Sequence, residues 1–318
     1  MFKPKSNFRF FSVLLVILIS FTFQVFSYQS PYYFLRTTTG ARSTGLAGSF
    51  VSIAGDITGL FFNPASIYTV EDKKFEVTFF KNVVDINSGN AAYLFNLGNG
   101  AKLATAAEFT NYGSFQGADN SGIKTSEFSS NDVCMTVVYS DILDSNLYYG
   151  VGLELLYNNI EKYSSTAFAA NGGLFYRLKD KRTTLGLSIL HAGMQISKFN
   201  GYSEKLPLDI RLGVSNRLRG LPLLINFSFN HLADSANKFF DKFLNFSLGG
   251  EFYFGKYLQV RAGYDNQYRR FTSSQADKKL AGFCAGIGLN FEKFNFDYGV
   301  AAEGSTEYLH KFSIYFNL

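Results

Sequence analysis

The last nine residues of the chain, 310–318, read HKFSIYFNL. Apolar residues occupy every second position and alternate with polar or amphipathic ones to the end of the chain. A period of two is typical of a β-strand with one face in an apolar environment. We expect this strand to be a C-terminal insertion signal of a membrane barrel, carried by Phe312, Ile314, Phe316 and Leu318. The alternative is the closing strand of a soluble sandwich, so the remaining sequence has to decide.

The same alternation recurs along most of the chain. Expected strands lie at about residues 75–79, 91–97, 102–109, 133–140, 147–155, 166–178, 183–192, 208–215, 223–230, 244–254, 258–264, 281–291 and 294–301. Many of these segments are about as long as the strands that cross a bilayer obliquely. With residues 310–318 they make about fourteen, an even number as in single-chain bacterial barrels.

The polar positions of these segments distinguish a membrane barrel from a sandwich. They hold mainly Gly, Ser, Asn and Thr, and charged residues make up only 17% of the chain. Soluble domains have roughly 25%, and a sandwich would place many Lys and Glu residues on its outer faces. Small and polar residues are typical of a barrel lumen. The sequence therefore predicts an all-β fold, a transmembrane antiparallel β-barrel of about 14 strands.

Six charged residues fall on positions that should face the lumen. They are Glu154, Asp209, Arg211, Glu251, Arg261 and Asp297. We expect a hydrogen-bonded network there; the other roles open to these residues are to line a pore or to grip a plug. Short expected turns lie at 144–146, 179–182 and 254–256, and longer polar loops at 113–131, 196–206, 233–241 and 269–279. In outer-membrane barrels the short turns face the periplasm.

The N-terminal residues predict export. Three basic residues precede an uncharged apolar run at 10–23, and Val25-Phe26-Ser27 fits a cleavage site. This is the pattern of a cleaved signal peptide, residues 1–27. A retained anchor helix is the alternative, but the run is short for a membrane helix. Beyond residue 27 no apolar run reaches about 18 residues, as a helical span requires. We therefore expect the outer membrane of a Gram-negative bacterium.

Composition and motifs give no support for nucleic-acid binding or catalysis. Loss of the three leader basic residues lowers the formal charge from +5 to +2 (5 − 3), too small a basic field to attract nucleic acid. His191, His231 and His310 lie on separate expected strands without a second metal ligand at a suitable spacing. We expect no enzyme, no cofactor and no metal; a hydrolase with a Ser or Asp near one of these histidines is a weaker alternative. Export permits a disulfide between the two cysteines, which we interpret as small apolar strand residues.

A glycine-rich segment precedes the first expected strand. Residues 40–66 read GARSTGLAGSFVSIAGDITGLFFNPAS. A phosphate-binding loop would need Lys and Ser or Thr directly after Gly45, where Leu46 and Ala47 stand. A solvated linker would not be so apolar. We expect residues 28–73 to form a hatch that plugs the barrel, residues 74–318, with Asn63-Pro64 as a rigid turn into the first strand.

This segment resembles the N-terminal signature of the PorV/PorQ family, FadL-like barrels of the type IX secretion system. The shared features are a Gly-Ala-Arg start, a Gly-Gly-like pair, an acidic residue and Asn-Pro-Ala. Further blocks, among them LPLDIRLGVSNRL, GGEFYFGKYLQVRAGYDNQYRR and the HKFSIYFNL ending, resemble the PorQ branch. The resemblance places the hatch motif at Gly45, Gly48, Asp56, Asn63, Pro64 and Ala65. Ala47, in place of a second glycine, and a single acidic residue at position 56 depart from the pattern.

The resemblance implies a function without catalysis. It would be that of an outer-membrane component of type IX protein secretion, which binds other secretion components or cargo proteins and contacts outer-membrane lipid. The alternative is a FadL-type transporter of hydrophobic small molecules, for which a barrel of the same appearance would serve. An apolar path from a loop pocket to an opening in the wall would favour the transporter.

Overall fold

The computed structural model describes residues 31–71, 74–81, 86–98, 100–199, 201–271, 280–302 and 308–317. The expected signal peptide at 1–27 and Leu318 lie outside these residues, as do 28–30 and 72–73 of the expected hatch. None of the helices in the described parts of the chain is long and apolar enough to cross a membrane.

Fourteen antiparallel strands form one closed barrel, in which each strand pairs with its neighbours in sequence and β1 pairs with β14. The first seven are β1 (Lys74–Lys81), β2 (Asn87–Asn96), β3 (Lys102–Ala118), β4 (Lys124–Asp144), β5 (Leu147–Ile160), β6 (Tyr163–Arg177) and β7 (Thr183–Ser197). The others are β8 (Asp209–Arg217), β9 (Leu223–Phe229), β10 (Phe246–Phe254), β11 (Leu258–Asp265), β12 (Phe283–Asn290), β13 (Phe294–Ala302) and β14 (Tyr308–Asn317). The predicted all-β barrel of about 14 strands is confirmed.

The alternation of side chains explains the closed wall. On β5 the inward residues are buried, among them Glu154 and Leu156, whereas the outward Val151 and Leu153 are 53% and 54% exposed. Exposed apolar residues on one face and buried small or polar residues on the other are the arrangement of a barrel in lipid. Because neighbouring strands pair all around the ring, the wall has no open sheet edge over its paired length.

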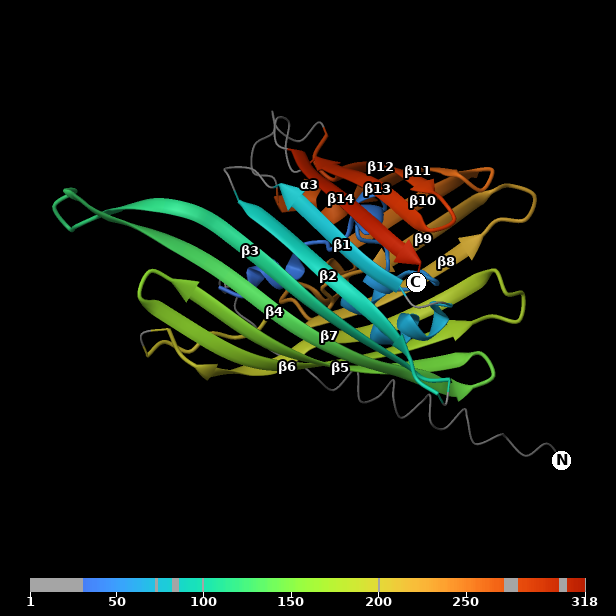
Figure 1. Cartoon of the computed structure of the whole chain (residues 1–318), viewed down its shortest axis with the longest axis horizontal. Coiled ribbons are helices and arrows are strands. Elements are labelled where there is room, and N and C mark those ends of the chain that lie inside the picture. Colours follow the sequence, from blue (N-terminus) through green and yellow to red (C-terminus); the bar gives the residue numbers. More distant parts are fainter. Residues whose placement is uncertain are drawn as a thin grey trace.

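The wall is uneven in height (Figure 1). Strands β3 to β7 have 14 to 21 residues, and strands β8 to β14 have 7 to 10. The expectation of a polar loop over residues 113–131 is wrong, because β3 and β4 continue as a hairpin that turns at residues 119–123. Phe115 and Phe128 stack across this hairpin. Its residues are mostly polar on both faces, so the sequence has no apolar alternation to reveal the strands.

The two ends of the barrel differ in their connections. At the end that we call the turn end, residues 145–146, 178–182 and 255–257 make short links. At the loop end, residues 198–208 and 230–245 make longer ones, and the second contains the 3-10 helix η4 (Phe239–Leu244). The helix α3 (Asn266–Phe271) follows β11 at this loop end. Short turns are typical of the periplasmic side.

The described N-terminal residues, 31–71, lie inside the barrel and are called the hatch from here on (blue in Figure 1). The hatch contains η1 (Tyr33–Arg36), α2 (Ala41–Gly45), η2 (Ile57–Phe61) and η3 (Pro64–Thr69). Tyr32 contacts Ser165 near the loop end, and β1 begins at Lys74, at the turn end. The hatch therefore crosses the lumen from one end to the other.

Candidate functional site: the hatch and its seat in the lumen

Eight inward-facing glycines of the wall lie against the backbone or side chains of the hatch. These glycines, which we call the glycine seat, are Gly150, Gly173, Gly186, Gly213, Gly249, Gly263, Gly286 and Gly299. They come one from each strand from β5 to β13, except β9. On β9 the small Ser228 lies there instead, with its Oγ 3.4 Å from the Oγ of Ser49 in the hatch.

The distances show why larger residues would not fit. A Cβ added to Gly150 would lie 2.3 Å from the carbonyl carbon of Pro64. One added to Gly186 would lie 2.2 Å from the carbonyl oxygen of Val51, and one at Gly299 would lie 2.2 Å from that of Ala41. Glycine permits a close approach of two backbones that any side chain would block. The hatch therefore packs backbone to backbone on this part of the wall.

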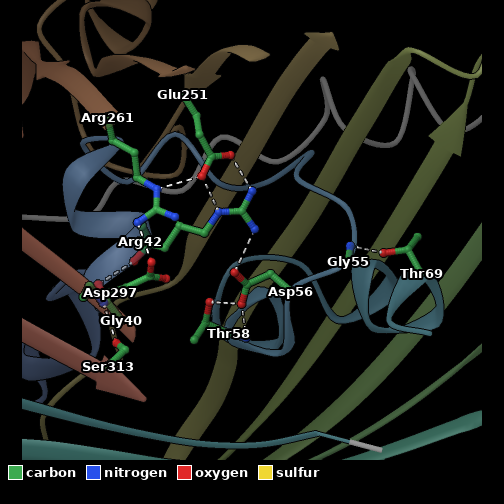
Figure 2. A network of polar contacts seen from close by, with 12 residues as sticks. Gly40, Arg42, Gly55, Asp56, Thr58, Thr69, Glu251, Arg261, Asp297 and Ser313 are labelled. Atoms are coloured by element: carbon green, nitrogen blue, oxygen red, sulfur yellow. Dashed lines mark hydrogen bonds and ion pairs between the residues drawn. The ribbon is translucent and has the colours of Figure 1, made fainter. Parts of the chain in front are cut away.

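A buried ionic cluster joins the hatch to strands β10, β11 and β13 (Figure 2). It consists of Arg42, Asp56, Glu251, Arg261 and Asp297. The Arg42 guanidinium donates from Nη2 to Glu251 Oε2 at 2.6 Å and from Nη1 to Asp56 Oδ2 at 3.0 Å. Arg261 donates to Glu251 Oε1 and to Asp297 Oδ1, both at 2.7 Å. Arg42 thus bridges a carboxylate of the hatch and one of the wall.

Each charge in this cluster depends on its partners. Burial disfavours the Arg42 cation, but the carboxylates of Glu251 and Asp56 outweigh this effect and hold the pKa of the guanidinium well above its usual value. Asp56 also accepts hydrogen bonds from the backbone N–H and hydroxyl of Thr58, at 2.9 and 2.6 Å, and so caps η2. Removal of one partner would leave a buried charge uncompensated.

Asn63 ties the second half of the hatch together and to the wall. Its Nδ2 donates to the carbonyl oxygens of Val51 and Leu174, each at 3.0 Å. Its Oδ1 accepts from the backbone N–H of Ala65 at 3.1 Å, which caps η3 with Pro64 at the first helical position. A single buried amide therefore fixes the loop before η3, the start of η3 and strand β6.

The opposite part of the wall contacts the hatch through apolar side chains. Ile57, Leu60, Ile67 and Val70 of the hatch form one buried cluster with residues of β2, β3, β4 and β14. The wall residues of this cluster are Ala92, Leu94, Ala104, Ala106, Val138 and Tyr315. This contact is a close-packed hydrophobic core, in which side chains fill the space between the hatch and the wall.

Near the loop end the first hatch residues occupy a second apolar cluster. Tyr32 and Leu35 are buried there against Leu206 and inward residues of β4, β5 and β6. These wall residues are Cys134, Leu156, Ala167 and Ala169. We call this cluster the loop-end pocket. Arg36 closes it toward the β9–β10 loop through a bidentate pair with Asp234, at 2.8 and 2.5 Å.

Two histidines lie in buried hydrogen-bonded groups of the lumen. His191 Nδ1 lies 2.9 Å from Glu154 Oε2, and Asn171 donates to the other oxygen of Glu154. The second group is Asp209, Arg211 and His231, with 2.6 Å between Arg211 Nε and Asp209 Oδ2 and 2.9 Å between His231 Nδ1 and the same oxygen. Among the described residues no group of His, Cys, Asp and Glu could hold a metal ion. Cys134 and Cys284 are buried and are not joined by a disulfide.

The six lumen charges expected from the sequence all lie in these networks. Glu251 pairs with Arg42 of the hatch, and Arg261 and Asp297 extend that cluster along the wall. Of the hatch motif, Gly45 packs on Gly286, with 3.2 Å from a Cβ added at Gly286 to the Gly45 Cα. Gly48 has φ +69°, and Ala47 before it has φ +54°, a left-handed conformation that alanine rarely adopts. The role of these residues in hatch movement stays a prediction. Phe312, Ile314 and Phe316 face outward on β14.

Two residues that contact the wall from the hatch were not predicted from the sequence, Arg42 and Tyr32. A signal existed for Arg42, because it is the one cation between residues 40 and 66 and the wall carries more inward carboxylates than cations. A buried carboxylate needs a cation nearby, so a pairing between this arginine and a lumen carboxylate could have been expected. Nothing in the sequence distinguishes Tyr32 from its neighbours Tyr33 and Phe34.

Comparison with known proteins identifies the fold. No protein-family model and no curated protein matches the sequence. The toluene transporter TodX of Pseudomonas putida matches in structure with a TM-score of 0.60 at 11% identity, over 87% of this chain and 97% of that one. A FadL homologue of Pseudomonas aeruginosa matches with a TM-score of 0.55 at 10% identity, over 88% and 98%. The chain therefore has the fold of the FadL-type outer-membrane barrels.

Proposed function

We propose that the protein admits a hydrophobic small molecule across the outer membrane. The observation that carries this proposal is the loop-end pocket, a buried apolar cluster that Tyr32 and Leu35 of the hatch form with the inner wall of the barrel. FadL-type fold and transport of toluene coincide in TodX, which supports the proposal by analogy. The fold also supports a function without catalysis, because TodX, which shares it, is a toluene transporter.

The lumen is unlike that of a pore for polar solutes. A porin keeps a water-filled channel, whereas here the hatch is packed against the wall by the glycine seat, the buried ionic cluster and an apolar core. Passage therefore requires either movement of hatch segments or a route along the apolar contacts. An apolar solute loses little favourable hydration free energy when it enters such surroundings, whereas a polar solute loses its hydrogen bonds with water.

The test uses cells of a Gram-negative host whose outer membrane excludes hydrophobic dyes. Expression of the full chain should raise the uptake of the apolar dye N-phenylnaphthylamine several-fold, without a rise in hydrolysis of the polar reporter nitrocefin by periplasmic β-lactamase. An unrelated outer-membrane barrel at equal expression is the control. Unchanged dye uptake would overturn the proposal, and an equal rise with both probes would indicate an open pore instead.

A component of type IX secretion is the second candidate. Its support is the resemblance of the hatch motif and of the C-terminal blocks to the PorV/PorQ family. Affinity purification from the outer membranes of the native host, followed by identification of co-purifying proteins, tests it. Recovery of secretion components in amounts comparable to the barrel would favour this candidate, and recovery of the barrel alone would count against it.

A further inference from the structure

We infer that the loop-end pocket is a binding site for a neutral hydroxylated aromatic molecule of the phenol class, which replaces the side chain of Tyr32. This inference rests on the proposed function and specifies its substrate class. It starts from the observation that a part of the chain already occupies the pocket. The side chain of Tyr32 is fully buried there, as a flat ring with a hydroxyl at one end.

The walls of the pocket suit a single aromatic ring. Ala167 and Ala169 are consecutive inward residues of β6, and their small side chains leave room for the ring of Tyr32 beside Leu156 and Cys134. Leu206, from the β7–β8 loop, belongs to the same buried cluster. Burial of an aromatic ring in such surroundings supplies most of the binding free energy of a small ligand.

The polar end of the pocket is oriented by a chain of hydrogen bonds. The backbone N–H of Glu204 donates to Gln195 Oε1 at 2.8 Å, which turns the amide nitrogen of Gln195 toward Ser165. Gln195 Nε2 then donates to Ser165 Oγ at 2.7 Å. Ser165 donates its own proton to the carbonyl oxygen of Ser197, at 2.8 Å.

This arrangement leaves Ser165 able only to accept from the pocket. A serine hydroxyl has one proton and two lone pairs, and here the proton and one lone pair are engaged. The hydroxyl of Tyr32, 2.6 Å from Ser165 Oγ, is therefore the donor. Burial raises the pKa of the Tyr32 hydroxyl, so that it keeps its proton. A ligand in this place has to bring an O–H or N–H donor.

The hydrogen bonds of Ser165 also select against anions. A carboxylate ligand has no proton to donate to Ser165 Oγ, whose own proton goes to the carbonyl oxygen of Ser197. A hydrocarbon without a hydroxyl would lose the hydrogen bond to the second lone pair of Ser165 and should bind at least tenfold more weakly. A neutral phenol meets both conditions, as the tyrosine side chain does.

The segment that carries Tyr32 is the part of the hatch best able to yield. Tyr33 is 61% exposed, and the partly buried ion pair of Arg36 and Asp234 keeps some contact with solvent. The glycine seat and the buried ionic cluster contact the hatch only from Ala41 onward. Residues 32–36 can therefore leave the pocket while the remainder of the hatch stays seated.

The experiment measures equilibrium binding to the purified full chain in detergent by isothermal titration calorimetry. The probes are p-cresol, which is the tyrosine side chain cut after Cβ, toluene, which lacks the hydroxyl, and 4-methylbenzoate, which is anionic. Tyr32→Ala should bind p-cresol at least tenfold more tightly than the wild type, because no ring has to be displaced. It should also bind p-cresol at least tenfold more tightly than the other two probes.

Further variants test whether Ser165 causes the preference for p-cresol. In the Tyr32→Ala background, Ser165→Ala should remove the preference for p-cresol over toluene, and Ser164→Ala, the exposed neighbour on the outer face of β6, should keep it. In the wild type, saturating p-cresol should speed amide hydrogen exchange at residues 32–36. Equal binding of p-cresol and toluene by Tyr32→Ala, a preference that survives Ser165→Ala, or unchanged exchange in the wild type would each overturn the inference.

These outcomes are distinct from failure of the proposed function. If dye uptake by cells is raised but p-cresol is not preferred, transport stands and the substrate class is wrong. If p-cresol binds as expected but no apolar probe enters cells, the pocket stands as a binding site and the transport function fails.

Discussion

The hatch is held on its two sides by different kinds of contact. On strands β5 to β13 its backbone approaches glycines, and Arg42 reaches into the buried ionic cluster. On strands β14, β2, β3 and β4, apolar side chains interdigitate with alanines and leucine. On the first side, an added side-chain atom would clash with the backbone of the hatch, and loss of one charge would leave a buried partner uncompensated. The second can adjust by repacking, so graded changes should give graded effects.

The largest effect is expected from the ionic side. Arg42→Met removes the cation and leaves Glu251 and Asp56 close together and buried, which should lower the free energy of unfolding by about 4 kcal/mol. Urea unfolding in lipid vesicles measures it. The double variant Arg42→Met with Glu251→Gln should recover part of the loss. If the single variant unfolds as the wild type does, the cluster does not hold the hatch.

An added methyl group on the glycine side should rank next. Gly150→Ala places a Cβ against the backbone of Pro64, and the hatch has to shift at a free-energy cost of about 3 kcal/mol, the upper end of the usual range for overpacking. Gly172→Ala on β6 is the matched control, because an added Cβ there meets nothing within 4 Å. Amide hydrogen exchange of residues 57–70 should rise in the first variant alone. Equal exchange in both would show that the close approach is not required.

The apolar side should respond less. Leu60 is fully buried against the wall alanines, and Leu60→Ala should cost about 2–3 kcal/mol, since part of the cavity can close. Leu60→Met keeps the volume and should cost less than about 1.5 kcal/mol. The same urea titration compares them. A larger loss for Leu60→Ala than for Arg42→Met would reverse the proposed ranking of the two sides.

The smallest effect is expected at the edge of the loop-end pocket. Arg36→Gln breaks the partly buried pair with Asp234, whose side chains are 16% and 27% exposed; because both keep contact with solvent, we expect a loss of about 1 kcal/mol, the upper end for exposed pairs. The melting temperature should stay close to that of the wild type, while exchange at residues 32–36 should rise. A loss as large as that of Arg42→Met would show that the first hatch residues are as firmly held as the rest.

The sequence predicted the barrel well because the pattern that identifies each strand lies within that strand. Alternation within each segment, as in residues 147–155, is enough to place a strand and its inward face. The hatch was predicted from the apolar, glycine-rich segment at residues 40–66, whose composition fits neither a solvated linker nor a phosphate-binding loop. The hairpin at 113–131 was missed because its residues lie outside the apolar environment that produces alternation.

The contacts of the site could not be predicted in the same way, because they join residues that lie far apart in the sequence. Arg42 and Glu251 meet only because the barrel closes and the hatch folds into it. The left-handed backbone of Ala47 has no residue-type signal, since glycine would be expected there. The pocket around Tyr32 is assembled from three strands and a loop, and its hydrogen-bond direction appears only when Glu204, Gln195 and Ser165 are placed together.

The glycine seat also has a consequence for the order of assembly. The hatch precedes β1 in the chain, but its seat is made by β5 to β13, which are synthesised later. The seat is complete only when β5 to β13 have assembled, and the β1–β14 pair then closes the ring around the hatch. A barrel whose later strands have not assembled therefore has an unprotected N-terminal segment. Protease resistance of residues 41–70 would report that the strands of the seat have come together around the hatch.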